Sequence, residues 1–224
     1  MKILVTAFEP FGGNVQNSSW EVAQLLPDHI GSSIIVKGML PVDFMDARKE
    51  LRSLIDLHLP DVVLSLGQSS KFEGLSIERV ALNLMDSIKP DNAGHAPTNE
   101  PIHPDGDTAY MTAIPVRLMA DACNRKGIAA KVSNSAGTYV CNSVYYEALY
   151  AIARQRLPLR ALFIHLPHIP EQEKSPMVAK ERLAEGISEI IFQLEGIYGK
   201  AKRRGSNVGR SSIRRSRMHR RAGL

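Results

Sequence analysis

Short apolar segments rich in β-branched residues alternate along the chain with longer segments whose apolar positions recur every three to four residues. The short segments predict strands, and the longer ones predict helices. The predicted strands are Lys2–Phe8, Ser33–Leu40, Asp61–Leu66, Leu75–Leu82, Ala129–Ser133 and Ala161–Leu166. The predicted helices are Ser18–Leu26, Phe44–Leu59, Ala113–Lys126, Asn142–Arg156 and Ser175–Tyr198.

This alternation predicts an α/β fold: a single-domain α/β/α sandwich over residues 1–199, with a mixed, mainly parallel central sheet. Val62, Val63 and Leu64 are apolar on both faces of their strand, as expected where helices cover both sides of a sheet. The segment Asp86–Thr108 contains four prolines and two glycines. It therefore predicts a long loop, and long ordered loops in compact domains are often functional.

The charge of the chain is unevenly distributed. Of the 28 Lys and Arg residues, ten lie between Lys200 and Leu224, where no acidic residue occurs. The remaining 18 face 23 acidic residues, so the body of the chain is mildly acidic. Because the 200–224 segment has few apolar residues, we expect a basic, disordered tail. Such a tail attracts phosphate-rich or acidic partners, but without interleaved aromatic residues the interpretation as a solvated appendage is favoured.

Cysteine content and hydropathy indicate the compartment. Two cysteines do not make a disulfide framework, which favours a cytoplasmic protein. No apolar run approaches the length of a membrane span, so no membrane partner is expected. The first residues, Met1 to Phe8, are typical of a first strand and not of a signal peptide.

Cys141 is the first candidate for chemistry. A predicted strand ends near Ser133, a turn of small residues follows, and a helix is expected to start near Cys141. A helix N-terminus stabilises a thiolate through its dipole and its unpaired N–H groups, which also bind an oxyanion. The alternative is that Cys141 is a small buried apolar residue. For Cys123, inside a predicted helix, that alternative is preferred.

A thiolate nucleophile needs a base that also protonates the leaving group, and histidine suits this role near neutral pH. His165 stands at the carboxyl end of an apolar strand, where site residues of α/β proteins gather, and His168 follows in the loop. A carboxylate is then needed to orient the imidazole. Glu78 lies inside an apolar strand, so it is either paired, with Arg79 or another residue, or catalytic.

With these segments side by side, the chain resembles the pyroglutamyl peptidase I (pyrrolidone-carboxylate peptidase) family of cysteine peptidases over about residues 2–197. Four blocks carry the resemblance: Phe8-Glu9-Pro10-Phe11-Gly12-Gly13, Ile77-Glu78-Arg79-Val80-Ala81-Leu82-Asn83, Ser135-Ala136-Gly137-Thr138-Tyr139-Val140-Cys141-Asn142 and Phe163-Ile164-His165-Leu166-Pro167. One departure falls in the segment Asp86–Asn92, where Ile88 occupies the position of the family's usual arginine.

The resemblance implies a triad of Glu78, Cys141 and His165, an α/β/α fold, no cofactor, and a cytosolic homo-oligomer, often a tetramer. The implied reaction releases an N-terminal pyroglutamate (5-oxoproline) from peptides. The family's substrate pocket maps onto five residues: Phe8, Phe11, Gln68, Tyr139 and Val140. A lactam has two apolar faces for aromatic side chains and a polar edge that needs hydrogen bonds, which Gln68 and backbone groups are suited to provide. The alternative for the two phenylalanines is a place in the core.

Two other functions remain open at this stage. In the first, the chain binds nucleic acid through its basic tail, and the α/β body is an inactive scaffold. In the second, the fold is the same but the enzyme hydrolyses another amide of a small lactam-like substrate. Pocket residues alone do not distinguish the second alternative from pyroglutamyl peptides.

Overall fold

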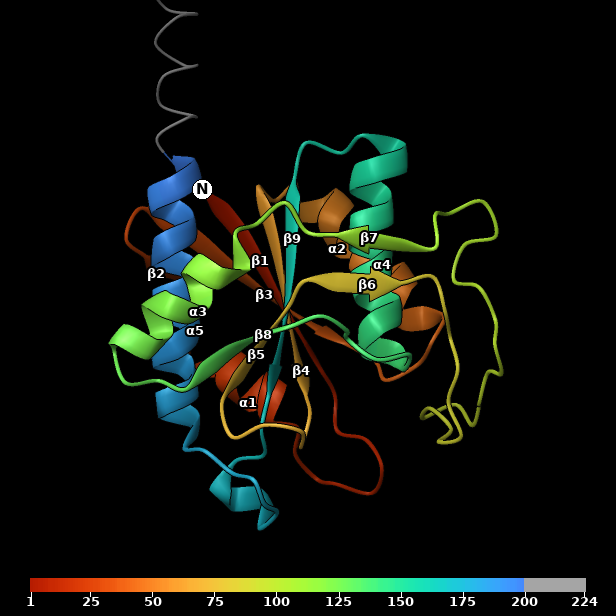
Figure 1. The fold of residues 1–224 in the computed structure, drawn as a ribbon, viewed down its shortest axis with the longest axis horizontal. Helices are drawn as coiled ribbons and strands as arrows, with labels where there is room; N and C mark the ends of the chain where they lie inside the picture. The colour runs from red at the N-terminus through yellow and green to blue at the C-terminus, as the bar shows by residue number, and fades with distance from the viewer. Residues whose placement is uncertain (200–224) are drawn as a thin grey trace, which may run out of the picture.

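The computed structural model describes residues 1–199, and its centre is a seven-stranded sheet with helices on both faces (Figure 1). The order of strands across the sheet is β2-β3-β1-β4-β9-β5-β8, and β6 pairs with β7 in a separate two-stranded sheet. The strands are β1 (Lys2–Phe8), β2 (His29–Ile30), β3 (Ser33–Leu40), β4 (Val62–Gln68), β5 (Leu75–Glu78), β6 (Val80–Leu82), β7 (Ala109–Met111), β8 (Ala130–Ser133) and β9 (Arg160–Leu166).

The helices form the two outer layers of the sandwich. They are α1 (Ser18–Leu25), α2 (Asp46–His58), α3 (Val116–Arg125), α4 (Val140–Gln155) and α5 (Lys180–Leu194), the last followed by a π-helical turn at Glu195–Gly199. In Figure 1, α1, α3 and α5 lie on one face of the sheet, and α2 and α4 lie on the other. Among residues 1–199, no helix is long and apolar enough to cross a membrane.

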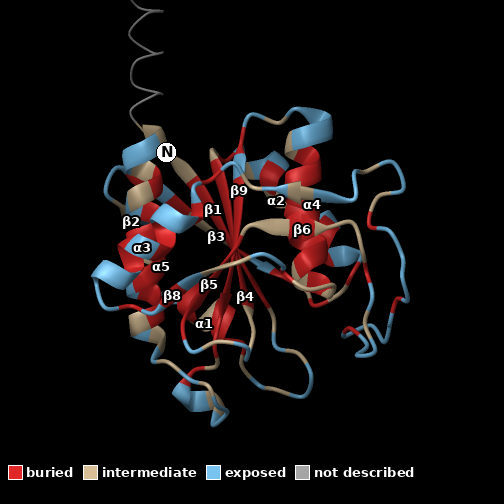
Figure 2. Ribbon diagram, in the orientation of Figure 1, coloured by how far each residue is buried: buried red, intermediate tan, exposed pale blue. Residues whose placement is uncertain are grey.

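Alternating residues of the central strands fill two hydrophobic cores. On β1, Ile3 and Val5 pack with α1, α3 and α5, whereas Leu4 and Phe8 pack with α2 and α4. Both sets are buried, and Figure 2 shows the central strands buried along most of their length. A strand covered on both faces has apolar side chains at successive positions, which explains apolar runs such as Val62-Val63-Leu64. The predicted α/β/α fold is confirmed.

Strand direction divides the sheet. β1 runs parallel to β3 and β4, and β4 runs parallel to β9. β5 runs antiparallel to β9 and parallel to β8, so β5 and β8 are reversed relative to the four central strands. The carboxyl ends of β1, β3, β4 and β9 therefore meet at one edge of the sheet, the usual location of a site in α/β proteins.

One predicted strand was wrong. The segment Leu75–Leu82 is broken at Arg79: β5 belongs to the central sheet, and β6 pairs with β7 instead. The reason is a change of partner, because the Arg79 N–H donates to Ser133 O while the Thr112 N–H donates to Arg79 O. The predicted helix Ser175–Tyr198 begins later, at Lys180. The predicted tail at 200–224 lies outside the described residues.

Candidate active site

Cys141 is the second residue of α4 and follows the turn of residues 134–139. In this turn Gly137 has a φ of +82°, a conformation that favours glycine. The first N–H groups of a helix have no partner within it, and here the Ser143 N–H is bonded to Tyr139 O at 3.2 Å. The earlier N–H groups and the helix dipole provide positive potential around Cys141.

Asn142 fastens the beginning of α4 to β6. The side chain is fully buried, and its Oδ1 accepts a hydrogen bond from the Leu82 N–H at 2.9 Å. Its Nδ2 donates to Leu82 O at 2.9 Å and to Leu84 O at 3.0 Å. Because a backbone N–H only donates, the orientation of this amide is fixed. The position of the neighbouring Cys141 therefore depends on the small second sheet.

His165 and Glu78 lie on adjacent antiparallel strands. In the register of β5 and β9, Glu78 is opposite Phe163, so His165 is its diagonal neighbour on the same face of the sheet. His165 Nδ1 lies 2.8 Å from Glu78 Oε1, and both side chains are buried. A carboxylate oxygen accepts this hydrogen bond, so Nδ1 carries a proton and the other ring nitrogen, Nε2, is the one left for chemistry.

The Cys141 sulfur lies over Gly67, next to His165. Gly67 pairs with His165 across β4 and β9, and a Cβ placed on Gly67 would lie 2.9 Å from Cys141 Sγ. Burial alone lowers the pKa of His165, but its interactions with Cys141 and Glu78 outweigh burial and raise the pKa to about 9. The raised pKa favours an imidazolium at neutral pH, the form that pairs with a thiolate.

The ion-pair partner of Glu78 among the described residues is His165 and not Arg79. Glu78 is 2% exposed, and its second oxygen, Oε2, is buried without a hydrogen-bond partner in the described part of the chain. The Tyr145 hydroxyl donates to Glu78 O at 3.0 Å and so ties the end of β5 to α4. The only side-chain partner observed for this carboxylate among residues 1–199 is the imidazole of His165.

The other cysteine and the other strand-end histidine are placed differently. Cys123 is buried within α3, where burial raises the pKa of its thiol to about 11. This agrees with its expected role as a small core residue. His168 lies beyond the strand, and burial lowers its pKa. Glu78 hydrogen-bonds to His165, so the geometry favours His165 over His168 as the partner of the sulfur.

Aromatic side chains gather beside the start of α4. The rings of Phe11 and Tyr139 are 6.5 Å apart, and Phe44 meets Tyr139 edge-on at 5.3 Å. Phe8 is 2% exposed and packs against Phe163, whereas Phe11 is half-buried. The sequence did not indicate Phe44, because it stands just before a helix and nothing local links it to the pocket.

The long loop after β6 is attached to this aromatic cluster. The Tyr139 hydroxyl donates to Pro90 O at 3.0 Å, and burial raises the pKa of Tyr139 to about 12. Asp91 is buried and accepts from the Phe44 N–H at 3.0 Å. Ile88 in the same loop is 99% exposed. Two hydrogen bonds, each between a side chain and the main chain, thus hold the loop against the aromatic cluster.

A gap in the sheet ladder lies next to the sulfur. β1 and β4 are paired only as far as Thr6 and Ser65, although β1 continues to Phe8 and β4 continues to Gln68. The two strands therefore separate at their carboxyl ends, between the chain that follows β1 and the residue beneath Cys141. Their connections leave in opposite directions across the sheet, the arrangement that forms a crevice in α/β proteins. Val140, the first residue of α4, is buried.

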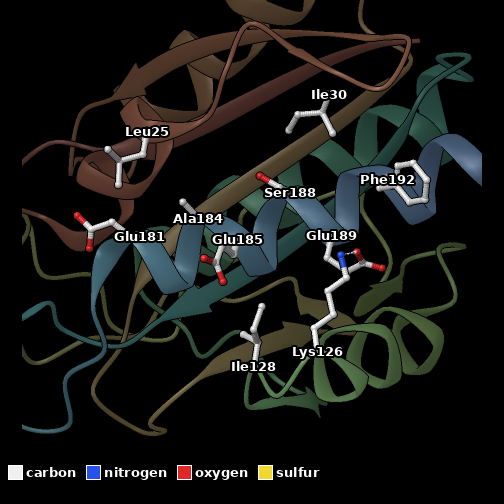
Figure 3. A pocket seen from close by; sticks show the side chains of 10 residues that line it. All are labelled: Leu25, Ile30, Lys126, Ile128, Glu181, Ala184, Glu185, Ser188, Glu189 and Phe192. Atoms are coloured by element: carbon white, nitrogen blue, oxygen red, sulfur yellow. Dashed lines mark ion pairs between the residues drawn. The ribbon is translucent and has the colours of Figure 1, made fainter.

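A hollow lies on the face of the sheet that α1 and α5 cover, opposite to α4. It has a volume of 830 Å³ and is lined by side chains of α1, α5 and the α3–β8 connection, including Leu25, Ile128 and Phe192 (Figure 3). Its Glu189 is paired with Lys126 at 2.5 Å, as the dashed line in Figure 3 marks. This hollow contains neither cysteine nor histidine. Among residues 1–199 no three His, Cys, Asp or Glu side chains gather to hold a metal ion.

Comparisons with known proteins point to one family. The family model described as pyroglutamyl peptidase matches residues 1–188. A pyrrolidone-carboxylate peptidase of Thermococcus onnurineus is 42% identical over 194 residues, which cover 85% of this chain and 97% of that protein. The pyrrolidone-carboxylate peptidase of Lactobacillus johnsonii is 41% identical over 204 residues, which cover 89% of this chain and 95% of that protein.

Solved structures agree with the sequence comparisons. The pyrrolidone carboxyl peptidase from Thermococcus litoralis superimposes with a TM-score of 0.84 at 33% identity, covering 90% of this chain and 96% of that one. Pyroglutamyl peptidase I from Bacillus amyloliquefaciens gives a TM-score of 0.81 at 35% identity, covering 84% of this chain and 94% of that one.

Proposed function

The chain belongs to the pyroglutamyl peptidase family of cysteine peptidases, and from this membership we propose that it hydrolyses the amide bond after an N-terminal pyroglutamyl residue of peptides. Cys141, His165 and Glu78 act together in this reaction. The supporting observation is the 2.8 Å hydrogen bond between His165 and Glu78, beside a sulfur at the start of a helix.

In the first step, the Cys141 thiolate attacks the carbonyl carbon of the pyroglutamyl residue and forms a C–S bond. The carbonyl oxygen becomes an oxyanion, which the N–H groups at the start of α4 stabilise. The C–N bond to the next residue then breaks, and the His165 imidazolium gives its Nε2 proton to the departing amine. A thioester and a shortened peptide result.

In the second step, water hydrolyses the thioester. His165, now neutral, takes a proton from the water, and the resulting hydroxide attacks the thioester carbonyl. The C–S bond breaks, free pyroglutamate leaves, and the thiolate and imidazolium are restored. Glu78 keeps a proton on His165 Nδ1 throughout and stabilises the imidazolium whenever Nε2 is also protonated.

The crevice between the ends of β1 and β4 is the proposed lactam site, with Phe8, Phe11, Gln68, Tyr139 and Val140 as substrate-binding residues. Aromatic side chains contact the two faces of the ring, and polar groups of the strand ends bond its N–H and C=O edge. Proline lacks the ring carbonyl, so it would leave a buried donor unpaired, which a site of this kind rejects strongly.

A panel of chromogenic amides tests this proposal. We expect the pyroglutamyl amide to be cleaved, with kcat/KM exceeding that of the prolyl and alanyl amides by at least about a hundredfold. Equal cleavage of the prolyl amide would contradict lactam recognition. Cleavage of another lactam amide in preference to pyroglutamyl would favour the alternative substrate.

Further expectations accompany this function. We propose a cytoplasmic homo-oligomer, a dimer or a tetramer, acting without a cofactor, with the peptidase domain spanning residues 1–199 and a basic tail at 200–224. The compartment is supported by the two unpaired cysteines and the assembly by the family resemblance. Light scattering of the purified chain measures the assembly directly, and a monomer at micromolar concentration would contradict it.

A further inference from the structure

We propose that Gln172 is a positioning residue for the lactam pocket, and that Gln68 faces the substrate with its main chain and not with its side chain. Gln172 holds the segment that carries Phe11 against the end of β4. This inference rests on the proposed function, because it concerns the same pocket. It adds a residue that neither the motifs nor the triad includes.

The hydrogen bonds of the two glutamines have a fixed direction. The Ser18 N–H donates to Gln68 Oε1 at 2.9 Å, and the Ile169 N–H donates to Gln172 Oε1 at 3.0 Å. Because backbone N–H groups only donate, both amide oxygens are identified, and neither amide fits when flipped. Gln172 Nε2 then donates to Gln68 Oε1 at 2.8 Å and to Gln16 O at 3.2 Å.

The side chain of Gln68 lies on the face of the sheet away from Cys141. Successive residues of a strand point to opposite faces. Gly67 lies beneath the Cys141 sulfur, on the face covered by α4. Gln68 is next and pairs with Leu166, which belongs to the core under α1, α3 and α5. The contact with Ser18, the first residue of α1, agrees with this direction.

The oxygen of Gln68 is therefore already occupied by two donors on the α1 side of the sheet. What β4 presents to the crevice is the backbone at Gly67 and Gln68, where the ladder to β1 has ended. A lactam has one N–H and one C=O on the same edge, which complement a free strand edge. The specificity of this position accordingly depends on where the main chain lies, and less on which side chain it carries.

Gln172 joins the three segments that set this main chain. It bonds the β1–α1 segment at Gln16, the end of β4 at Gln68 and the chain after β9 at Ile169. A second contact links two of these segments, since Lys174 Nζ, in the chain after β9, donates to Asn14 Oδ1 in the β1–α1 segment. Phe11 lies in the β1–α1 segment. Loss of the Gln172 hydrogen bonds therefore lets the segment that carries Phe11 move, while Cys141, His165 and Glu78 keep their positions.

The substitution Gln172→Leu keeps the approximate volume and removes every hydrogen bond of the amide. We expect KM for a pyroglutamyl amide to rise about tenfold while kcat stays within about threefold of wild type. The rate of Cys141 alkylation by iodoacetamide and its pH dependence stay unchanged. The matched control is Gln193→Leu, because Gln193 on α5 also donates to one side chain, Glu189 at 2.8 Å, far from the pocket.

Gln68→Glu tests the role of the Gln68 main chain. The carboxylate still accepts from Ser18 and Gln172 but has lost the amide NH₂. We expect KM to rise less for Gln68→Glu, which keeps both hydrogen bonds, than for Gln68→Leu, which behaves like Gln172→Leu. A KM for Gln68→Glu raised about a hundredfold would overturn the inference, since the NH₂ would then bind the substrate. A kcat of Gln172→Leu that falls as far as its kcat/KM would also overturn it.

Hydrogen exchange separates this inference from the proposed function. We expect residues 9–18 to exchange faster in Gln172→Leu than in wild type or Gln193→Leu, whatever the substrate. A wild-type chain that leaves pyroglutamyl amides intact contradicts the proposed function. Faster exchange of residues 9–18 in Gln172→Leu would still support the positioning role of Gln172. Unchanged exchange at residues 9–18 in Gln172→Leu would overturn the positioning role of Gln172.

Discussion

Glu78 Oε1 and His165 Nδ1 are 2.8 Å apart on adjacent antiparallel strands, a contact between residues 87 positions apart in the chain. The reversal of β5 relative to β9 makes them diagonal neighbours on the face that α4 covers. On that face the Glu78 carboxylate has no other ion-pair partner within residues 1–199, so its charge acts mainly on the imidazole.

We expect Glu78→Gln to shift the pH profile. His165 has a pKa raised to about 9, so the imidazolium is present below that value and is lost as pH rises through it. Glu78 contributes to the rise, so removing its charge lowers the pKa of His165. The alkaline limb of kcat/KM therefore moves to lower pH in Glu78→Gln, and kcat falls.

The matched control for this experiment is Glu147→Gln. Glu147 is also buried, and its Oε2 lies 2.6 Å from Nε2 of a histidine, His103. Glu147 lies further along α4 than Cys141 and does not pair with His165. We expect its alkaline limb to coincide with wild type. Coincident limbs for Glu78→Gln and wild type would contradict the role of Glu78.

Gly67→Ala is expected to displace the sulfur. The added Cβ would lie 2.9 Å from Cys141 Sγ and 2.8 Å from Phe163 Cζ, closer than real Cβ atoms approach. Misplacement of a nucleophile by about 1 Å costs about a hundredfold in rate, so kcat/KM should fall by that order. Steady-state kinetics measure the loss. Gly196→Ala is the control, because nothing lies within 4 Å of its Cβ position, and an equal loss there would contradict the steric explanation.

Asn142→Asp is expected to destabilise the fold by about 2–3 kcal/mol. One carboxylate oxygen keeps the bond to the Leu82 N–H, but the other replaces an NH₂ that donates to Leu82 O and Leu84 O. Oxygen then faces oxygen in a fully buried position. Urea unfolding at pH 7 measures the change. Wild-type stability would mean that β6 does not hold the start of α4.

The sequence anticipated the elements better than their arrangement. Lys2–Phe8 and Ser33–Leu40 are strands with the predicted bounds, because β-branched runs between turn residues are local signals. The order of the sheet is not local, and nothing in Leu75–Leu82 indicates that its second half leaves the sheet to pair with Ala109–Met111. That break at Arg79 creates β6, which anchors Asn142.

For the site, too, the sequence indicated single residues better than their arrangement in space. Cys141 was recognisable from a turn of small residues before a helix, and His165 from its place at a strand end. Their approach to Glu78 depends on the antiparallel register of β5 and β9, which the hydrophobic pattern does not encode. Gln172 and Phe44 had no local signal, since a glutamine in a short 3-10 helix and a phenylalanine before an α-helix are ordinary in any protein. Only the fold brings Phe44 against Tyr139 and Gln172 against Gln68.

We expect Cys141→Ala to abolish hydrolysis and Cys141→Ser to retain a small residual rate, because a serine hydroxyl is a far weaker nucleophile without a stronger base. Cys123→Ala is the control. Cys123 is buried and its thiol has a pKa raised to about 11, so activity should persist there with only a loss of stability. A wild-type rate in Cys141→Ala would exclude the sulfur from the chemistry.

The most direct measurement follows iodoacetamide labelling and pyroglutamyl-amide hydrolysis in the same wild-type samples near neutral pH, with the alkylated residue located by peptide mass spectrometry. We expect one equivalent of label on Cys141, Cys123 unmodified, and activity falling in proportion to the label. Full alkylation of Cys141 with activity intact, or loss of activity while Cys141 remains unmodified, would contradict a thiolate mechanism in this chain.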